Sequence, residues 1–255
     1  MATYKKRGAK PKDKKGQNQI DESQFETAEV FNTLDETASK SEQWIEKNSK
    51  PLFTGLLVVV GLFLAFLAYN KYVVEPKESE AANELAFPRK YFDEALTAGT
   101  DVDSLFNLGL EGADGKYGFV DIAESFSGTK AGNLANYYAG VSYLKMKQYE
   151  KAIEYLSNFS SDDQLLGPTA LGAIGDAFAD INQPEDALGY YEDAANKKKN
   201  DFTTPLFLYK AAQTAMQLKK YSKAESLYTR IKEDFAKSDQ GKDIDKYINS
   251  AKYAE

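Results

Sequence analysis

The chain has 255 residues, of which 42% are hydrophobic, so it is long and apolar enough to contain a folded core. It contains neither cysteine nor histidine, which excludes disulfides, cysteine nucleophiles, Cys/His zinc sites, histidine-held haem and Ser-His-Asp triads. Residues 71–255 carry 22 basic and 30 acidic side chains, a net charge of −8, and this balance argues against nucleic-acid binding by the larger part of the chain.

The first 50 residues divide into a basic and an acidic part. Residues 1–15 hold seven basic side chains and one acidic one, with no apolar pattern, so we expect a disordered tail that sets membrane topology. Clustered cations there could also contact nucleic acid, a ribosome or anionic lipid. Residues 16–50 have a net charge of −5 and a sparse helical spacing of apolar residues from Phe31 to Ile45. That spacing predicts a short amphipathic helix that leads into the next segment or binds a partner helix.

An uncharged apolar stretch of 19 residues follows, from Pro51 to Tyr69. As a helix it would extend about 28 Å, close to the roughly 30 Å of a bilayer's hydrocarbon core. A buried core helix normally keeps a polar stripe, whereas residues 56–67 are apolar all round, and a cleaved signal would begin earlier and be shorter. We therefore predict a single transmembrane helix over residues 51–72. Its apolar side chains include Leu52, Leu56, Leu57, Leu62, Leu64 and Tyr69.

The charges on either side of this stretch bear on its orientation. The N-terminal 50 residues carry ten Lys and Arg, and the positive-inside rule places such a short tail in the cytoplasm. We expect the 185 residues that follow the stretch to lie on the far side of the membrane. Close to the stretch the two flanks differ only slightly, with three lysines before it and two in the 15 residues after it. An inverted topology therefore stays open.

Three segments of the remaining chain align with one another, beginning at Asn133, Pro168 and Pro205. The spacings are 35 and 37 residues, and small residues recur at matching positions in each segment. This pattern predicts a pair of antiparallel helices per segment, because two helices cross closely only where Gly or Ala lies at the contact. The small residues assigned to this packing are Gly140, Ala152, Gly175, Ala187, Ala212 and Ala224. The turn between the paired helices is expected at Tyr149, Pro184 and Tyr221.

The segments that flank the repeats are less regular. A helix is expected to continue out of the membrane and to be interrupted at Pro88, and one further helical segment, Phe119–Phe126, lies between two Gly-containing breaks. We interpret residues 78–130 as a degenerate first repeat or an N-terminal cap, and residues 243–254 as a final capping helix. The predicted organisation is a tail (1–50), a transmembrane helix (51–72), a linker helix with the degenerate repeat or cap (73–132), and three repeats with the capping helix (133–255).

The repeated positions resemble the tetratricopeptide repeat, which has a small residue at position 8, Ala at position 20 and an aromatic residue or Leu at position 24. The resemblance implies an all-α solenoid whose first helices line a concave groove for protein partners. The positions that it points into the groove are Leu134, Tyr137, Val141, Leu144, Lys145, Thr169, Gly172, Asp176, Ala179, Asp180, Leu206, Tyr209, Gln213, Met216 and Gln217. Their mixture of Tyr, Leu and Met suits an extended, partly apolar segment or a partner helix. For about half of them, packing between repeats is the alternative role.

No motif in the sequence predicts chemistry. The Gly-rich segment "EGADGKYG" lacks the GK[ST] pattern of a phosphate loop, and paired acidic residues such as Asp162 and Asp163 lie at predicted helix starts, where capping explains them. We therefore predict a protein that is not an enzyme and that has no catalytic residue, no metal site and no cofactor.

The order of tail, uncleaved span and acidic repeat domain resembles the YfgM type of bacterial inner-membrane protein. The resemblance implies a location in the inner membrane with the repeats in the periplasm. It also implies partnership with the SecYEG translocon and a PpiD-like chaperone, and assistance to newly exported envelope proteins. Two alternatives remain open: a scaffold for outer-membrane or cell-wall assembly, and a cytosol-facing adaptor with inverted topology.

Overall fold

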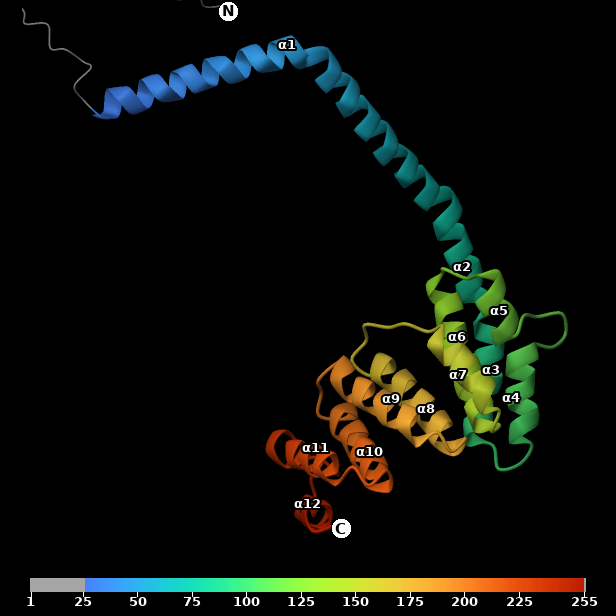
Figure 1. The fold of residues 1–255 in the computed structure, drawn as a ribbon. Helices are drawn as coiled ribbons and strands as arrows, with labels where there is room; N and C mark the ends of the chain where they lie inside the picture. Colours follow the sequence, from blue (N-terminus) through green and yellow to red (C-terminus); the bar gives the residue numbers. More distant parts are fainter. Residues whose placement is uncertain (1–25, 255) are drawn as a thin grey trace, which may run out of the picture. The chain divides into compact units, whose positions relative to one another are not determined.

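The computed structural model describes residues 26–254, with the side chains of residue 42 and of residues 44–254, and this range is all-helical (Figure 1). The predicted disordered tail, residues 1–15, lies outside the described residues. The chain divides into two units, one ending at Leu67 and one beginning at Ala68. We describe each unit separately.

In the described residues, the first unit consists of the long helix α1, Glu26–Tyr69, without its last two residues. Helix formation begins well before the apolar stretch, so the two helices expected on either side of residue 50 are one element. Pro51 lies inside α1 and removes the N–H that would bond to the carbonyl of Lys47. Figure 1 shows α1 bent near its middle, as a proline in a helix interior produces.

The C-terminal half of α1 presents apolar side chains on every face. Leu62 is 67% exposed, and none of the most apolar 18-residue window is buried, although its mean hydropathy is 2.5. By length and composition this helix could cross a membrane. No other helix among the described residues meets the same test.

The second unit begins with a π-helical turn, η2 (Asn70–Val74), followed by α2 (Glu75–Glu84) and α3 (Ala86–Thr97). The break between α2 and α3 lies at Leu85, and Pro88 explains its position because Pro has no N–H to donate to the carbonyl of Glu84. The expected interruption is present but lies three residues earlier, and Pro88 itself is in the first turn of α3.

Two short helices precede the aligned repeats. Helix α5, Phe119–Ser125, lies where a helical segment was expected. Helix α4, Val102–Glu111, was not predicted. Its apolar residues follow a helical spacing, but Gly109 and Gly112 concealed it. A Cβ at Gly109 would lie 3.2 Å from the Pro88 carbonyl oxygen and 3.3 Å from the Phe119 ring, so this glycine lets α4 approach its neighbours closely.

The three aligned segments each form a pair of helices, and the chain ends with a capping helix. The pairs are α6 (Lys130–Lys145) with α7 (Tyr149–Ser157), α8 (Leu166–Asp180) with α9 (Pro184–Lys197), and α10 (Thr203–Gln217) with α11 (Tyr221–Asp234); the last helix is α12 (Ile244–Lys252). Each pair also packs on the next, through α7 with α8, α9 with α10, and α11 with α12. The arrangement is a helical solenoid.

The turn inside each pair has the same geometry in all three repeats. Lys147, Asn182 and Lys219 lie in the left-handed region with φ of 58° to 59°. In the first turn the Gln148 N–H donates to the Tyr143 carbonyl, at 2.8 Å, in the pattern of a Schellman motif. The expected turn position was wrong by two residues. Tyr149, Pro184 and Tyr221 are the first residues of the second helices.

The recurrent small residues lie buried where the paired helices cross. Added Cβ atoms would lie 2.5 Å from Leu156 at Gly140 and 2.7 Å from the Tyr191 ring at Gly175. The four recurrent alanines have no exposed surface. These alanines are Ala152, Ala187, Ala212 and Ala224. Any larger side chain at these positions would push the paired helices apart.

Candidate partner-binding face

The first helices of the repeats, α6, α8 and α10, are neighbours and together present one face of the solenoid. We call this the first-helix face and define it by the fifteen positions that the sequence pattern predicted. Five of the fifteen have exposed side chains. These are Lys145, Ala179, Asp180, Gln213 and Gln217. Three of them, Lys145, Asp180 and Gln217, occupy the same register position at the end of successive first helices, so they lie in a row.

The larger apolar side chains of the first-helix face are only partly exposed. Leu134, Val141 and Leu144 pack against the hydrophobic cluster around α3, α5 and α6, and Leu206 and Met216 pack against the cluster of the last two repeats. These side chains contribute to the packing between helices. A partner on this face would therefore contact their edges and would not enter a deep apolar groove.

Gly172 packs between repeats and does not offer a free surface. A Cβ at this position would lie 1.9 Å from Cε1 of Phe207, which is itself buried on α10. The absence of a side chain lets the Phe207 ring lie directly against α8. At the start of α8, the Thr169 hydroxyl donates to the Leu165 carbonyl at 2.7 Å.

Asp176 is held by side chains from two other helices. The Tyr191 hydroxyl, on α9, donates to Asp176 Oδ1 at 2.7 Å, and Lys210 Nζ, on α10, lies 2.7 and 2.8 Å from the two carboxylate oxygens. The ammonium also lies 5.6 Å from the Tyr191 ring centroid. Burial, together with the hydrogen bond to Asp176, raises the pKa of Tyr191 well above its ordinary value. Asp176 therefore joins the second repeat to the third.

Asp180 also makes a contact within the solenoid. It hydrogen-bonds the hydroxyl of Tyr149, the first residue of α7. Desolvation and this carboxylate raise the pKa of Tyr149. Both acidic residues of the first-helix face, Asp176 and Asp180, thus already contact side chains of the solenoid. For new polar contacts the face offers mainly Lys145, Gln213 and Gln217.

Tyr209 belongs to an aromatic cluster at the C-terminal end of the solenoid. Its ring lies 5.8 Å from that of Tyr228 and 5.2 Å from that of Tyr247, which comes from α12. Burial raises the pKa of Tyr228 to about 12, with a smaller contribution from Tyr247. The cluster fixes the capping helix on the last repeat. Tyr137 packs similarly against Phe159, with ring centroids 5.1 Å apart.

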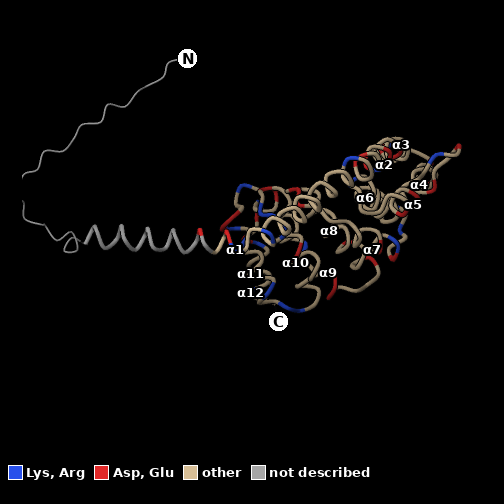
Figure 2. Tube along the Cα trace, turned by 90° about the horizontal axis from the view of Figure 1, so that it is seen from above, with Lys and Arg blue, Asp and Glu red and all other residues tan. Residues whose placement is uncertain are grey.

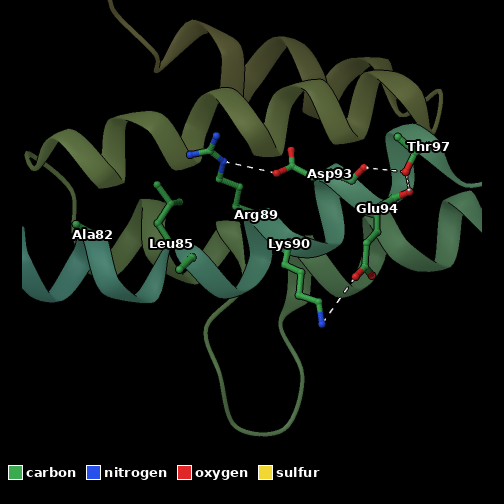
Figure 3. Close-up of a pocket in the computed structure, with 8 residues that line it drawn as sticks. Ala82, Leu85, Arg89, Lys90, Asp93, Glu94 and Thr97 are labelled. Carbon is green, nitrogen blue, oxygen red and sulfur yellow. Dashed lines mark hydrogen bonds and ion pairs between the residues drawn. The ribbon is translucent and has the colours of Figure 1, made fainter.

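The hollows on the second unit include four of about 370 to 620 Å³, and no predicted groove residue lines any of these four. The largest of the four follows one side of α2 and α3, and Figure 3 shows its lining residues. Two exposed ion pairs cross it, Arg89 with Asp93 at 3.7 Å and Lys90 with Glu94 at 3.8 Å. All eight lining residues come from α2, α3 and Leu85 between them, so this is a shallow stripe and not an enclosed site.

Basic and acidic residues are mixed along the chain of the second unit. Figure 2 shows Lys and Arg interspersed with Asp and Glu around the second unit. In the described part of the chain, no group of three or more acidic side chains is placed to hold a metal ion.

One comparison with known proteins gives a match. The tetratricopeptide repeat family matches residues 134–162, which cover most of α6 and all of α7. No curated protein and no solved structure matches the chain. The chain is thus an all-helical protein with a tetratricopeptide repeat, a module that mediates protein–protein interactions.

Proposed function

We propose that the protein is a membrane-anchored, non-enzymatic adaptor whose first-helix face binds other proteins beside the bilayer. The observation that carries this proposal is the exposure of the apolar residues of α1, which precede a helical solenoid. Transfer of about 20 such residues from water into lipid is favourable, because it removes their apolar surface from water. The solenoid then stays close to the membrane surface.

The finer part of the proposal is an ancillary role beside the SecYEG translocon and a PpiD-like chaperone, in which the protein assists newly exported chains. A face of half-buried Leu, Tyr and Met edges with Lys145, Gln213 and Gln217 suits weak binding of extended, partly apolar segments. Such binding does not require one client sequence. A scaffold for outer-membrane or cell-wall assembly would use the same face with a different partner.

Topology separates the exported-protein role from a cytosol-facing adaptor. The experiment fuses a phosphatase that is active only outside the cytoplasm after Glu255, and a second fusion places the same enzyme before Met1. Activity from the C-terminal fusion alone supports the proposal. Activity from the N-terminal fusion alone would establish the inverted orientation and would contradict it.

Photo-crosslinking in intact cells tests the partner. A photoreactive residue replaces Gln213 on the first-helix face, Leu62 in α1, or Asp193, an exposed residue of α9 that serves as the matched control. We expect Leu62 to capture translocon subunits and Gln213 to capture a chaperone or exported chains, with neither captured from Asp193. Recovery of outer-membrane assembly components alone would favour the scaffold. Equal capture from Gln213 and Asp193 would contradict a role for the first-helix face.

A further inference from the structure

Three large apolar side chains are exposed at the starts of α8 and α10. Leu165 is 49% exposed, Leu166 36% and Phe202 73%. Hydrogen bonds fix the backbone of all three residues: Asp163 Oδ1 accepts from the N–H groups of Leu165 and Leu166, and Asn200 Oδ1 accepts from that of Phe202 at 2.9 Å. The backbone that presents these side chains is therefore fixed, while a third or more of each residue's surface stays in contact with solvent.

The loops that carry these residues are joined to each other. Asn200 Nδ2 donates to the Gln164 carbonyl at 2.9 Å, and Lys198 Nζ lies 3.8 Å from Asp162 Oδ1. A further ion pair, Lys199 with Asp234 at 3.0 Å, connects the second of these loops to the end of α11. We call the row of loops that precede α6, α8 and α10 the loop edge.

The loop edge continues to the place where the chain enters the second unit. Glu78, on α2, accepts hydrogen bonds from the Lys130 N–H at 2.9 and 3.0 Å, at the start of α6. One turn later, Asn133 exchanges two hydrogen bonds with the backbone of Ser160, in the loop before α8. Glu78 follows Tyr69, the end of α1, by nine residues, which as a helix rise only about 14 Å.

Lysines accompany the apolar side chains on the loop edge. Lys198 and Lys199 form the ion pairs given above, whereas Lys130 and Lys197 form none within residues 26–254. Four of the five acids on this edge have partners: Asp162 pairs with Lys198, Asp234 with Lys199, and Glu78 and Asp163 accept from N–H groups at the starts of α6 and α8. The fifth, Asp201, adds one negative charge. Exposed apolar residues beside lysines are typical of protein surfaces that bind anionic lipid.

We propose that the loop edge lies on an anionic bilayer surface, with Leu165, Leu166 and Phe202 at the boundary between headgroups and acyl chains. The inference rests on the proposed function, because it requires that α1 spans the same bilayer. It adds that the solenoid is held in a fixed orientation on the membrane and does not swing freely on its anchor. The first-helix face would then always be presented in the same direction to partners.

The test measures lipid contact at single positions of the full chain. Because the protein has no cysteine, one cysteine carrying the fluorophore NBD is introduced as Phe202→Cys, Leu62→Cys or Tyr253→Cys. Tyr253, at the end of α12, is 73% exposed like Phe202 and is the matched control. Each protein is reconstituted in vesicles of phosphatidylethanolamine and phosphatidylglycerol (about 3:1) that contain doxyl-labelled lipid. We expect quenching by the doxyl lipid at Phe202 to be at least twice that at Tyr253, with blue-shifted emission.

The possible outcomes distinguish the membrane-bound loop edge from the membrane anchor on which it rests. Strong quenching at Leu62 with equal, weak quenching at Phe202 and Tyr253 would overturn the membrane-bound loop edge and leave the anchor intact. Weak quenching at Leu62 would overturn the anchor itself. A blue shift at Phe202 in detergent micelles that grows with protein concentration, without doxyl quenching in vesicles, would show that a second copy covers the edge, and would also overturn the inference.

The lysines provide a second readout. Lys197→Gln combined with Lys130→Gln is expected to reduce the quenching at Phe202, as is replacement of phosphatidylglycerol by phosphatidylcholine. Lys145→Gln, on the first-helix face, removes the same charge elsewhere and is expected to change nothing. Equal loss of quenching in the Lys145 variant would mean that net charge, and not the loop edge, determines the contact.

Discussion

Lys210 and Asp176 form an ion pair between two repeats, with the Lys210 ammonium within 2.8 Å of both carboxylate oxygens. Asp176 lies on α8 and also accepts the hydrogen bond of the Tyr191 hydroxyl on α9. A single carboxylate thus connects α8, α9 and α10. An adaptor that presents a face made of several repeats depends on such connections, because the shape of that face is set by how adjacent helix pairs are oriented.

Asp176→Ala is expected to destabilise the solenoid by about 1–2 kcal/mol, because Lys210 and Tyr191 lose their common acceptor. The carboxylate and ammonium are each about one third exposed, and solvent screening keeps the loss at this modest size. Urea unfolding of the detergent-solubilised chain, followed by circular dichroism, measures the effect. Asp193→Ala, an exposed change on α9, is the control and should differ from wild type by less than about 0.5 kcal/mol. An equal loss of stability in the Asp176→Ala and Asp193→Ala variants would contradict the role of Asp176 in joining the repeats.

Tyr191→Phe is expected to change how stability depends on pH above 10. The folded-state pKa of Tyr191 is raised, so the stability it contributes is present below its ordinary pKa of about 10 and is lost as pH rises above that value. The stability difference between wild type and Tyr191→Phe should therefore shrink by up to about 1.4 kcal/mol per pH unit above 10. Urea unfolding at pH 8, 9.5 and 10.5 follows this difference. A stability difference that stays constant over this pH range would contradict the role assigned to the Tyr191 hydroxyl.

Gly172→Ala tests the close contact between the second and third repeats. The new Cβ would lie within 2 Å of the Phe207 ring, and we expect a loss of about 1–3 kcal/mol from overpacking. Gly189→Ala is the matched control, because that helical glycine has nothing within 4 Å of the added Cβ, and it should stabilise the protein by about 0.5–1 kcal/mol. Phe207→Leu should partly rescue Gly172→Ala. Similar effects of the two alanine substitutions would contradict the packing described for Gly172.

The left-handed turns predict a stabilising substitution. Lys147 has a φ of 59°, a conformation that costs a lysine more than a glycine. Lys147→Gly should stabilise the repeat by about 0.5–1 kcal/mol, and Asn182→Gly by less, because Asn tolerates this region better. Lys151→Gly, in the interior of α7, should instead destabilise by a similar amount. Thermal unfolding of the three variants gives the order directly.

The repeat architecture could be predicted from the sequence because each helix pair requires small residues at its crossing. The recurrence of Gly140, Gly175 and Ala212 therefore identified the three pairs in phase. Helix α4 was missed because Gly109 serves the same packing purpose outside the periodic segments, where no second copy of the pattern revealed it. The left-handed residue of each turn was missed because lysine, and not glycine, occupies it in two of the three repeats.

The roles of individual groove positions were harder to predict. A repeat position states which face of a helix a residue lies on, but not which side chain of the next repeat reaches it. Asp176 occupies the same repeat position as Val141 and Gln213. Of the three, only Asp176 forms an ion pair with a lysine of the following repeat, Lys210 on α10. Gly172 occupies a repeat position that was predicted to contact a partner, but the Phe207 ring fills the space where its side chain would lie. Such pairings depend on the rotation between repeats, which no single segment encodes.

Glu78→Ala is expected to loosen the attachment of α2 to the first repeat. The carboxylate accepts from the N–H groups of Lys130 and Ala131 at the positive end of α6, and losing this cap should cost about 0.5–2 kcal/mol locally. Hydrogen exchange of the full chain in micelles should become several-fold faster at Lys130 and Ala131. Glu78→Gln keeps an acceptor oxygen and should fall between Ala and wild type.

Glu80→Ala is the matched control for that change, because it removes the same charge from an exposed position of α2 two residues later. Exchange at Lys130 should be unaffected by it. If both variants accelerate exchange equally, the effect comes from the net charge of α2, and Glu78 does not hold α2 to the solenoid. If only Glu78→Ala does so, this one carboxylate holds α2 to the start of α6.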